Sequence, residues 1–480
     1  MKYKRQRYRQ TTVQLVLLVF VLAGLGAAHR GYRPSGWIVL GCITAVILAY
    51  GRRSHAYLVA MALSGLSLGW WRGAVYLDML AAYQPYYDQP ITLWVTAQED
   101  AVYGKHSQVT FTAGNVELAS GQKLVGKLSV SGFGANAIYQ GDVIQASGKL
   151  RSGYGAKQGS FSFAKLSVVE RHNSWVAEIR RRFAAGMQTA LPEPLGSFAM
   201  GLLIGQRATL PEGVKEDLLM VGLTHIIAVS GYNLTIILHA SKKLLAKRSK
   251  RLATALSFSL IAIFLLLAGA SASIVRAAIV STLSIVTSYY GRLLPPLNLI
   301  GLAAAATAFA NPVYIWSDIS WYLSFLAFFG VMLLAPLVSE RLPGKSESIL
   351  LAVAIESICA ELLSLPIVLF IFGQMSFVGL PANVLVVALI PLAMLLATVS
   401  GLIGMLAPVV SGWFGWPTTQ LLNYMLDVSH LLASLPNIFR EHIGLSLAQM
   451  IGWYSGLGLL MTALWYKSRA RGATITDETW

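Results

Sequence analysis

The chain has 480 residues, of which 55% are hydrophobic and only 12% are charged, and its mean hydropathy is +0.61. This composition excludes an ordinary soluble globular protein and indicates a polytopic membrane protein. The formal net charge of +16 invites a nucleic-acid ligand, but most basic residues flank apolar runs, where cytoplasmic loops carry Lys and Arg. Cys42 and Cys359 lie in apolar runs and belong to no metal or redox motif.

Three apolar runs open the chain, at residues 12–28, 36–50 and 55–71. The first follows a basic tail and could pass for a signal peptide, but two more runs follow at once, so we interpret it as an anchor. With the basic tail in the cytoplasm, three crossings place the segment after residue 71 outside. Residues 1–75 are therefore predicted to form N-terminal transmembrane helices.

Residues 88–172 have a different pattern. Apolar and polar residues alternate, as at Ile91, Leu93 and Val95, and Gly-rich breaks separate short runs. Period-two alternation with regularly spaced turn signals predicts a small antiparallel β domain of five or six strands. Its size fits a small Greek-key barrel, inserted on the extracytoplasmic side.

The next segment, residues 173–195, is predicted to contain an amphipathic helix at the membrane surface. Three arginines interrupt an apolar stripe at helical spacing, and we expect them to meet lipid phosphates. The stripe is formed by Trp175, Val176, Ile179, Phe183 and Met187, and the arginines are Arg180, Arg181 and Arg182.

The central stretch, residues 201–247, contains an apolar run at 221–240 that is long enough for a membrane helix. The run nevertheless carries His225, Ser230 and Asn233, which lipid does not accommodate cheaply. On a continuous helix these three side chains could line one broad aqueous seam, with a broken or re-entrant helix beside it. The alternative is hydrogen bonding between neighbouring helices.

Further apolar runs lie at residues 252–267, 273–290, 299–310, 321–337, 349–372, 380–407, 413–435 and 445–465. Basic clusters at 242–251 and 467–471 are both expected inside, which favours a single net crossing within 380–407. The chain is thus predicted to be a polytopic α-helical protein of about ten to twelve spans. Its main transmembrane domain would be residues 196–468, followed by a cytoplasmic tail at 469–480.

Ionisable and amide groups inside apolar runs are the informative residues, because a charge facing lipid at mid-depth costs several kcal/mol. Arg276 is the strongest candidate for a functional role among them, since a guanidinium group is suited to phosphate recognition. The alternative is an internal ion pair. Its candidate partners are Glu356, Glu361 and Asp318.

Several short sequence motifs together resemble the signature of the ComEC-type competence protein family, the inner-membrane DNA-uptake channels of transformable bacteria. They are GLLIGQR at 201–207, GLTHIIAVSG at 222–231, SIVRAA at 273–278, WYLSFLA at 321–327, FGQMSF at 372–377 and PAN at 381–383. Their order and spacing agree over about residues 195–400. Two departures are Tyr232-Asn233 in place of a second His, and no His-x-His-x-Asp-His run of a metallo-β-lactamase-like domain.

The resemblance implies a channel that carries single-stranded DNA across the bacterial cytoplasmic membrane during natural transformation, with both termini cytoplasmic. It also implies an OB-like fold for the β domain, and three partners: a surface DNA receptor, a cytoplasmic helicase-like ATPase and a nuclease. No enzymatic activity is expected, because the chain has neither a Gly-x-x-x-x-Gly-Lys-Ser/Thr loop nor the run of the family's hydrolase module, and no cofactor or metal is expected. The candidate DNA-path residues are His225, Ser230, Asn233, Arg276, Gln374, Asn383 and Arg207.

OB folds bind single strands by stacking bases on aromatic residues over a basic groove. Nearby acidic residues almost cancel the basic ones, and several aromatics lie at strand spacing, so core packing is the competing interpretation. The candidates for base contact are Phe133, Tyr139, Lys149, Arg151 and Tyr154.

Two other classes of protein remain open. An intramembrane serine hydrolase would use Ser230 as nucleophile, but His225 is five residues away on the same run and nothing aligns His430. A small-solute transporter would predict inverted repeats between the halves, and none is visible.

Overall fold

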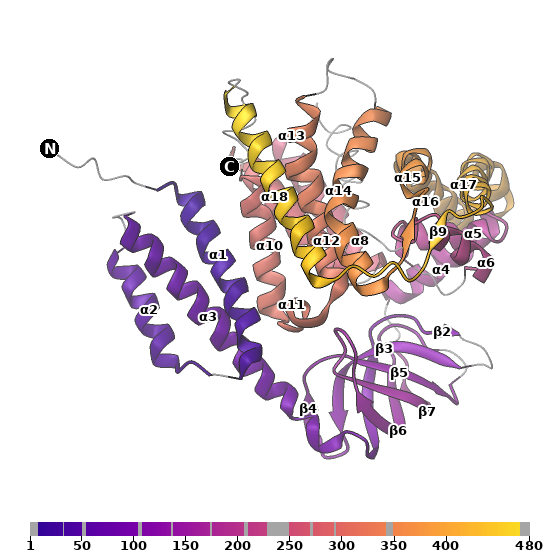
Figure 1. The fold of residues 1–480 in the computed structure, drawn as a ribbon. Helices are drawn as coiled ribbons and strands as arrows, with labels where there is room; N and C mark the ends of the chain where they lie inside the picture. The colour runs from indigo at the N-terminus through magenta and orange to yellow at the C-terminus, as the bar shows by residue number, and fades with distance from the viewer. Residues whose placement is uncertain are drawn as a thin grey trace. The chain divides into compact units, whose positions relative to one another are not determined.

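A computed structural model of the chain describes residues 8–31, 33–49, 54–103, 108–135, 138–172, 175–205, 210–227, 249–268, 272–291, 294–341 and 349–470. The chain divides into two compact units, Met1–Ala177 with Gly301–Tyr322 and Glu178–Ile300 with Leu323–Trp480. The first unit contains the N-terminal helices and a β-barrel, and the second contains most of the remaining helices (Figure 1).

The first unit begins with α1 (Gln10–Ala27), η1 (Ala28–Arg30), α2 (Gly36–Ala49) and α3 (His55–Ala81). Helices α1 and α3 touch backbone to backbone, because a Cβ on Gly69 would overlap the carbonyl oxygen of Val21. Gly65, one turn earlier, meets the carbonyl of Leu17 in the same way. Small residues at four-residue spacing permit this close approach of membrane helices.

The β-barrel follows α3 directly. Its elements are η2 (Gln84–Tyr86), β1 (Pro90–Ala97), β2 (Val102–Tyr103), β3 (Val109–Leu118), β4 (Lys123–Leu124), β5 (Leu128–Phe133), β6 (Val143–Ser152) and β7 (Gly159–Glu170). Strand β1 pairs with both β3 and β6, so the five long strands close in the order β1-β3-β5-β7-β6. All these pairs are antiparallel except β5–β7, which is parallel. The predicted inserted β domain is confirmed.

Alternation along the strands explains the barrel core. Leu93, Val95, Leu128 and Val130 are fully buried, while the residues between them face outward. Tyr83, between α3 and β1, is also fully buried in this core, so the barrel is continuous with the end of α3.

Residues 296–329 form α10 (Pro296–Ala310), α11 (Val313–Ser317) and α12 (Ile319–Phe329). Within the first unit, Trp316 Nε1 donates to the Leu25 carbonyl at 2.8 Å, and Ser317 Oγ donates to the Gly155 carbonyl at 2.6 Å. The turn around α11 is therefore bonded both to the end of α1 and to the barrel.

The second unit contains two groups of helices (Figure 1). One group is α4 (Trp175–Ala190), α5 (Leu195–Ile204), α6 (Glu212–Met220), α15 (Gly379–Val386), η5 (Val387–Leu389), α16 (Ile390–Leu406), η6 (Pro408–Val410) and α17 (Ser411–Ala433). The other is the π-helical η4 (Gly330–Leu334), α13 (Ala335–Ser339), α14 (Ile349–Phe372) and α18 (Leu447–Ala470). Helices α8 (Lys250–Ala268) and α9 (Ala272–Tyr289) pack against each other and contribute side chains to the core of the first group. Short strands β8 (Met375–Ser376) and β9 (Phe439–Arg440) pair between the two groups.

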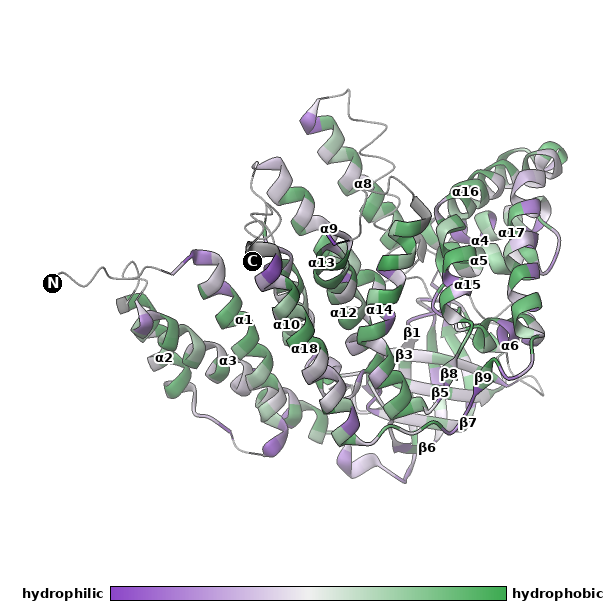
Figure 2. Cartoon of the chain, turned by 45° about the horizontal axis from the view of Figure 1, so that its top comes forward, coloured by the Kyte–Doolittle hydropathy of each residue, from purple (hydrophilic) through white to green (hydrophobic). Residues whose placement is uncertain are grey.

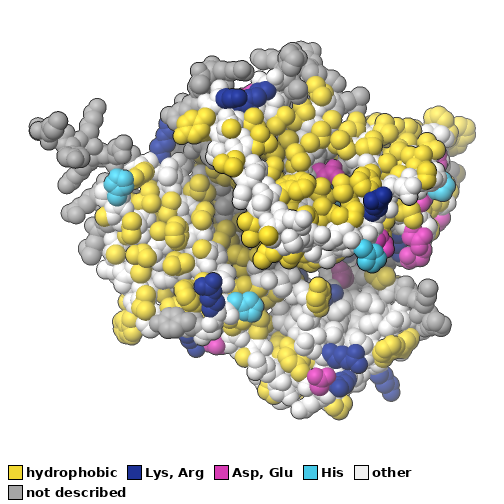
Figure 3. Space-filling model, viewed as in Figure 1, with side chains coloured by type: hydrophobic (Ala, Val, Ile, Leu, Met, Phe, Trp, Pro, Cys, Tyr) yellow, Lys and Arg dark blue, Asp and Glu magenta, His cyan; other side chains and the backbone are white. Residues whose placement is uncertain are grey.

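Six helices in the described residues are long and apolar enough to cross a membrane. Apolar residues continue along most helices, whereas the barrel strands are mixed (Figure 2). In Figure 3, hydrophobic side chains cover the helices, while the barrel face in view is mostly uncharged with a group of Lys and Arg. The chain is thus a multi-pass helical membrane protein with an inserted β domain, and its total number of spans stays a prediction.

Helix α4 packs into the second unit more deeply than its amphipathic pattern suggests. Phe183 and Met187 are buried in the main core, and Gly186 lies against the backbone of Gly404 in α16. The N-terminal half keeps Trp175 exposed, and Arg181 and Arg182 pair with Glu178. Those hydrogen bonds, chiefly from Arg182, hold the pKa of the Glu178 carboxyl below its usual value.

Candidate functional site

The site is built around the turn that ends α6. Gly222 has φ +76°, its N–H donates to the Leu219 carbonyl, and the Leu223 N–H donates to the Leu218 carbonyl. This pair of bonds is the usual way in which a glycine in the left-handed region ends a helix. Residues 221–227 are therefore a turn, and the predicted membrane helix beginning at residue 221 is wrong there.

This turn meets the start of α15. A Cβ on Gly222 would lie 3.4 Å from Ser376 Cβ and 3.6 Å from Gly379 Cα. On its other side, a Cβ on Gly379 would lie 3.5 Å from Glu361 Oε1 of α14. We call Gly222, Ser376, Gly379 and Glu361 the polar seam. Three segments far apart in the sequence thus approach one another with no side chain between the glycines.

Polar atoms beside the seam have few partners. Ser376 Oγ and Asn383 Oδ1 are buried and find no hydrogen-bond partner among the described residues. Most buried polar atoms in proteins are paired, so such groups mark places where water or a polar ligand is expected. His225 belongs to the same turn, and its Nδ1 lies 3.2 Å from the Gly222 carbonyl oxygen.

A short ribbon holds this region in register. Met375 pairs with Arg440 and Ser376 with Phe439, and the Phe377 N–H donates to the Ile438 carbonyl. The ribbon joins the end of α14 to the segment between α17 and α18.

Arg276 lies in α9 and is almost completely buried, with 3% of its surface exposed. Its guanidinium carbon is 5.8 Å from the centre of the Phe325 ring, a cation–π distance. Ile274 and Ala278, on either side of it, belong to the same hydrophobic core as Val221 and Ala382 next to the seam. The Arg276 helix and the seam therefore contribute to one hydrophobic core.

The predicted ion-pair candidates behave differently from one another. Asp318 Oδ1 accepts the N–H groups of Ser320 and Trp321, so Asp318 caps the start of α12. Glu356 and Glu361 form no ion pair with any described residue, and only Glu361 reaches the seam. Gln374 lies just before the ribbon and lines a cavity. Three remaining candidates lie outside the described residues: Arg207, Ser230 and Asn233.

Some of the barrel residues predicted to contact DNA are exposed, and others contact neighbouring side chains. Tyr154 is 86% exposed, and Phe133 stacks on Phe163 with ring centres 6.3 Å apart. Lys149 pairs with Asp88 at 3.2 Å, and Tyr139 lies under the Arg171 guanidinium. Phe161, by contrast, is a core residue with 1% exposure, and Arg151 is exposed.

His430, weighed above as a catalytic base, is within hydrogen-bond distance of Asp217, with Nδ1 and Oδ2 2.9 Å apart. The pair joins α17 to α6, and Ser230 lies outside the described residues. No group of three or more His, Cys, Asp or Glu that could hold a metal ion occurs in the described ranges.

The family model described as Competence protein matches residues 202–467, which is more than half of the chain. The chain belongs to the competence protein family. Among relatives, ComE operon protein 3 of Bacillus subtilis (strain 168) is 24% identical over 244 residues, which cover 50% of this chain and 31% of that protein. No solved structure matches significantly. Competence-family membership supports a role in competence and DNA uptake.

The competence-family region includes the polar seam, Arg276 and the ribbon. Sequence reasoning missed Ser376 as a member of the seam, and Glu441 and His442 beside Gln374. Ser376 could have been found from its position in the FGQMSF motif at residues 372–377. Glu441 and His442 lie in a segment without periodicity, so no pattern pointed to them.

Replacing Gly222 by alanine should lower the thermal stability of the purified protein. Gly222 has φ +76°, and a left-handed backbone costs an L-residue about 1–2 kcal/mol, whereas the added Cβ itself would only come into ordinary contact with Ser376 at 3.4 Å. Gly213→Ala is the matched control, because a Cβ on Gly213 of α6 would meet nothing within 4 Å. Equal unfolding temperatures for the two variants would show that the turn at Gly222 does not need a glycine.

Proposed function

We propose that this chain is a channel that carries single-stranded DNA across the cytoplasmic membrane of a bacterium during natural transformation. The observation that carries the proposal is the polar seam inside the competence-family region of a multi-pass membrane protein. Family membership supports competence and DNA uptake, and the single-stranded substrate and its path are what we add.

The physical problem is to move a polyanion through an apolar layer about 30 Å thick. A single strand needs a much narrower path than a duplex, and the wall must be polar, wet and weakly binding. Ser376 and Asn383 offer uncharged contacts that do not depend on base sequence. Arg276 would offset phosphate charge, while Glu361 would keep the strand from binding so tightly that it stalls.

The barrel would receive the strand before it enters the membrane. Five strands closed in the order β1-β3-β5-β7-β6 fit an OB-like barrel, a fold that binds oligonucleotides. Phe163 is 75% exposed and has φ +59°, so a strained backbone presents its ring beside Phe133. The two stacked, exposed rings could stack on bases. Lys165 lies opposite Phe133 on the neighbouring strand, so its ammonium group could bind the adjacent phosphate.

Charge distribution supports an orientation with both termini in the cytoplasm and the barrel outside. Basic residues gather before α1 and at the end of α18, where Lys467 begins the C-terminal cluster. In this orientation the barrel would lie on the side from which DNA arrives.

The proposal assigns no catalysis to this chain. Pulling force and strand removal would come from a helicase-like ATPase and a nuclease, and capture from a surface DNA receptor. A small-solute transporter is the alternative, and it would accumulate a labelled solute independently of DNA.

The test is a deletion of the gene in a transformable host, complemented with the intact chain and scored for labelled DNA in the cytosol. We expect surface-bound DNA to stay constant and cytosolic DNA to fall to background in the deletion strain. Normal entry of DNA into the deletion strain would refute the proposal.

A further inference from the structure

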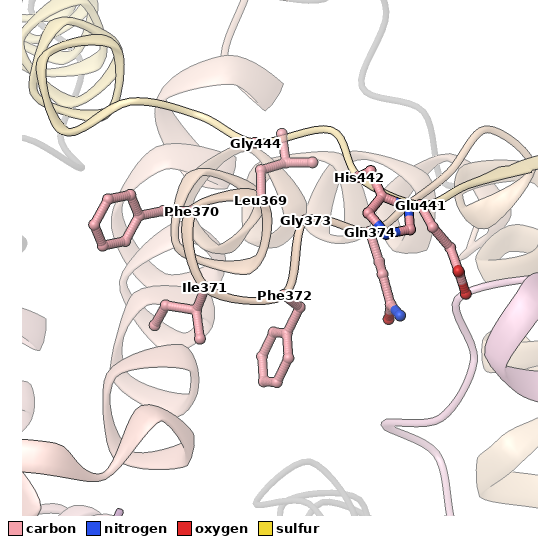
Figure 4. A pocket seen from close by; sticks show the side chains of 9 residues that line it. All are labelled: Leu369, Phe370, Ile371, Phe372, Gly373, Gln374, Glu441, His442 and Gly444. Atoms are coloured by element: carbon pink, nitrogen blue, oxygen red, sulfur yellow. The ribbon is translucent and has the colours of Figure 1, made fainter.

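A cavity of about 420 Å³ lies where α14 ends and the segment leading to α18 passes it (Figure 4). Phe370 and Phe372 line one part, and Gln374, Glu441 and His442 line the other. Figure 4 shows the three polar side chains grouped together, apart from the two aromatic rings. The volume is in the range of cavities that bind small ligands.

The backbone around the cavity is firmly built. Gly373 has φ +63°, and its N–H donates to the Leu369 carbonyl, which ends α14. The Ile443 N–H donates to the Gly373 carbonyl at 2.9 Å, so the two sides of the cavity are bonded to each other. His442 adopts φ +65°, a conformation that a non-glycine residue rarely adopts.

The cavity is lined by both apolar and polar side chains, and the polar ones have no side-chain partner among the described residues. Phe370 is 44% and Phe372 is 53% exposed. Gln374, Glu441 and His442 form no side-chain hydrogen bond or ion pair with the rest of the described chain. A ligand that has both an apolar part and several polar atoms would satisfy both halves of the cavity.

The electrostatics favour a cation at the polar end. Glu441 contributes a carboxylate, and the last carbonyl groups of α14 carry the negative end of the helix dipole. Arg440 precedes Glu441 in β9 and does not line the cavity, as expected when successive strand residues face opposite ways. A free phosphate is therefore disfavoured at this end, whereas an ammonium group is favoured.

The location indicates the source of such a ligand. The candidate membrane span Leu351–Phe372 ends at the cavity, and the span Leu447–Lys467 begins three residues beyond Gly444. The ends of two candidate spans meet here, so we expect this place to lie at the membrane surface, with the exposed aromatic rings against lipid chains and the polar side chains among head groups.

We propose that this cavity binds a phospholipid with a primary ammonium head group, such as phosphatidylethanolamine. The ammonium donates to the Glu441 carboxylate and to the terminal carbonyls of α14. The Gln374 amide and the His442 ring donate to the lipid phosphate, and an acyl chain lies along Phe370. This inference does not depend on the transported substrate.

The test is native mass spectrometry of the full-length detergent-purified protein with three lipids of identical acyl chains. Phosphatidylethanolamine should bind at about ten-fold lower concentration than phosphatidylcholine or phosphatidylglycerol, equivalent to about 1.4 kcal/mol. The head-group nitrogen of phosphatidylcholine is positively charged but carries only methyl groups in addition to its carbon chain, so it has no N–H donor. Weak binding of this lipid would therefore show that the site requires N–H donors and not only a positive charge.

Glu441→Gln should abolish the preference, because it weakens the binding of phosphatidylethanolamine and removes the repulsion of the anionic phosphatidylglycerol head group. Glu216→Ala, which removes an exposed carboxylate of α6, is the matched control and should keep the preference. Gln374→Leu is a second variant that should weaken all phospholipids, because it removes a phosphate donor. Equal binding of the three lipids by the unaltered protein, or an unchanged preference in Glu441→Gln, would overturn the proposal.

Discussion

Replacing Arg276 by methionine should sharply reduce the entry of DNA into the cytosol while leaving the DNA bound at the cell surface unchanged. Methionine keeps much of the length of the side chain and removes its charge, so phosphate groups passing the seam would lose their compensating cation. A loss of about 1.4 kcal/mol at the barrier slows a step about ten-fold, so we expect at least that reduction. The measurement is labelled DNA recovered from cytosol and surface fractions.

Arg251→Met provides the control, since Arg251 is exposed at the start of α8 and also loses one positive charge. Arg276→Lys should retain part of the uptake, because it keeps the charge. The amount of protein in the membrane must be measured for each variant, since Arg276 is buried against Phe325. Normal uptake by Arg276→Met at normal abundance would remove Arg276 from the DNA path.

Replacing Gly69 by leucine should prevent the first unit from assembling. The contact between α1 and α3 joins two backbones, so neither partner can rotate a side chain away from the new atoms. Overpacking typically costs about 1–3 kcal/mol and sometimes more, and a backbone contact belongs at the upper end. We expect little monodisperse protein after extraction and a lower unfolding temperature for what remains.

Gly26→Leu is the matched control on α1, because a Cβ there would meet nothing within 4 Å. It should give normal yield and normal thermal stability. If Gly69→Leu behaved like Gly26→Leu, the close packing of α1 on α3 would not contribute to the stability of the fold.

The β-barrel illustrates what the sequence makes predictable. Leu93 and Val95 alternate with outward residues in a strand buried on one face, and a period of two cannot be confused with a helix. The long apolar helices are equally clear, because an uncharged apolar run of about twenty residues has the length and composition that a membrane crossing requires.

The turn at Gly222 shows where such reasoning fails. The run 221–240 is continuous in hydropathy, so nothing in its average signals an interruption. The relevant signal is local: a glycine followed by Leu223 after a short helix is a C-terminal capping pattern. An average over a membrane-length window does not detect this local signal, and the seam expected for His225 assumed a helix over residues 221–227, where the chain forms a turn.

The seam itself depends on contacts that no local pattern encodes. Ser376 and Phe439 pair across more than sixty residues, in strands of two residues each, which is too short for periodicity to register. Glu361 could be recognised as unusual within an apolar run, but its proximity to Gly379 follows only from the packing of α14 against α15.

The ribbon also constrains how this protein is made. Because β8 and β9 are hydrogen-bonded to each other, residues 377–438 start and finish on the same face of the bilayer. A segment of that kind must cross an even number of times. Gly379–Leu406 is long and apolar enough for one crossing, so we expect α17 to return the chain and the two helices to enter the lipid as a pair. Residues 380–426 contain no acidic or basic side chain that would oppose insertion into lipid. If only one of the two helices crossed, β8 and β9 would lie on opposite sides of the bilayer and could not pair.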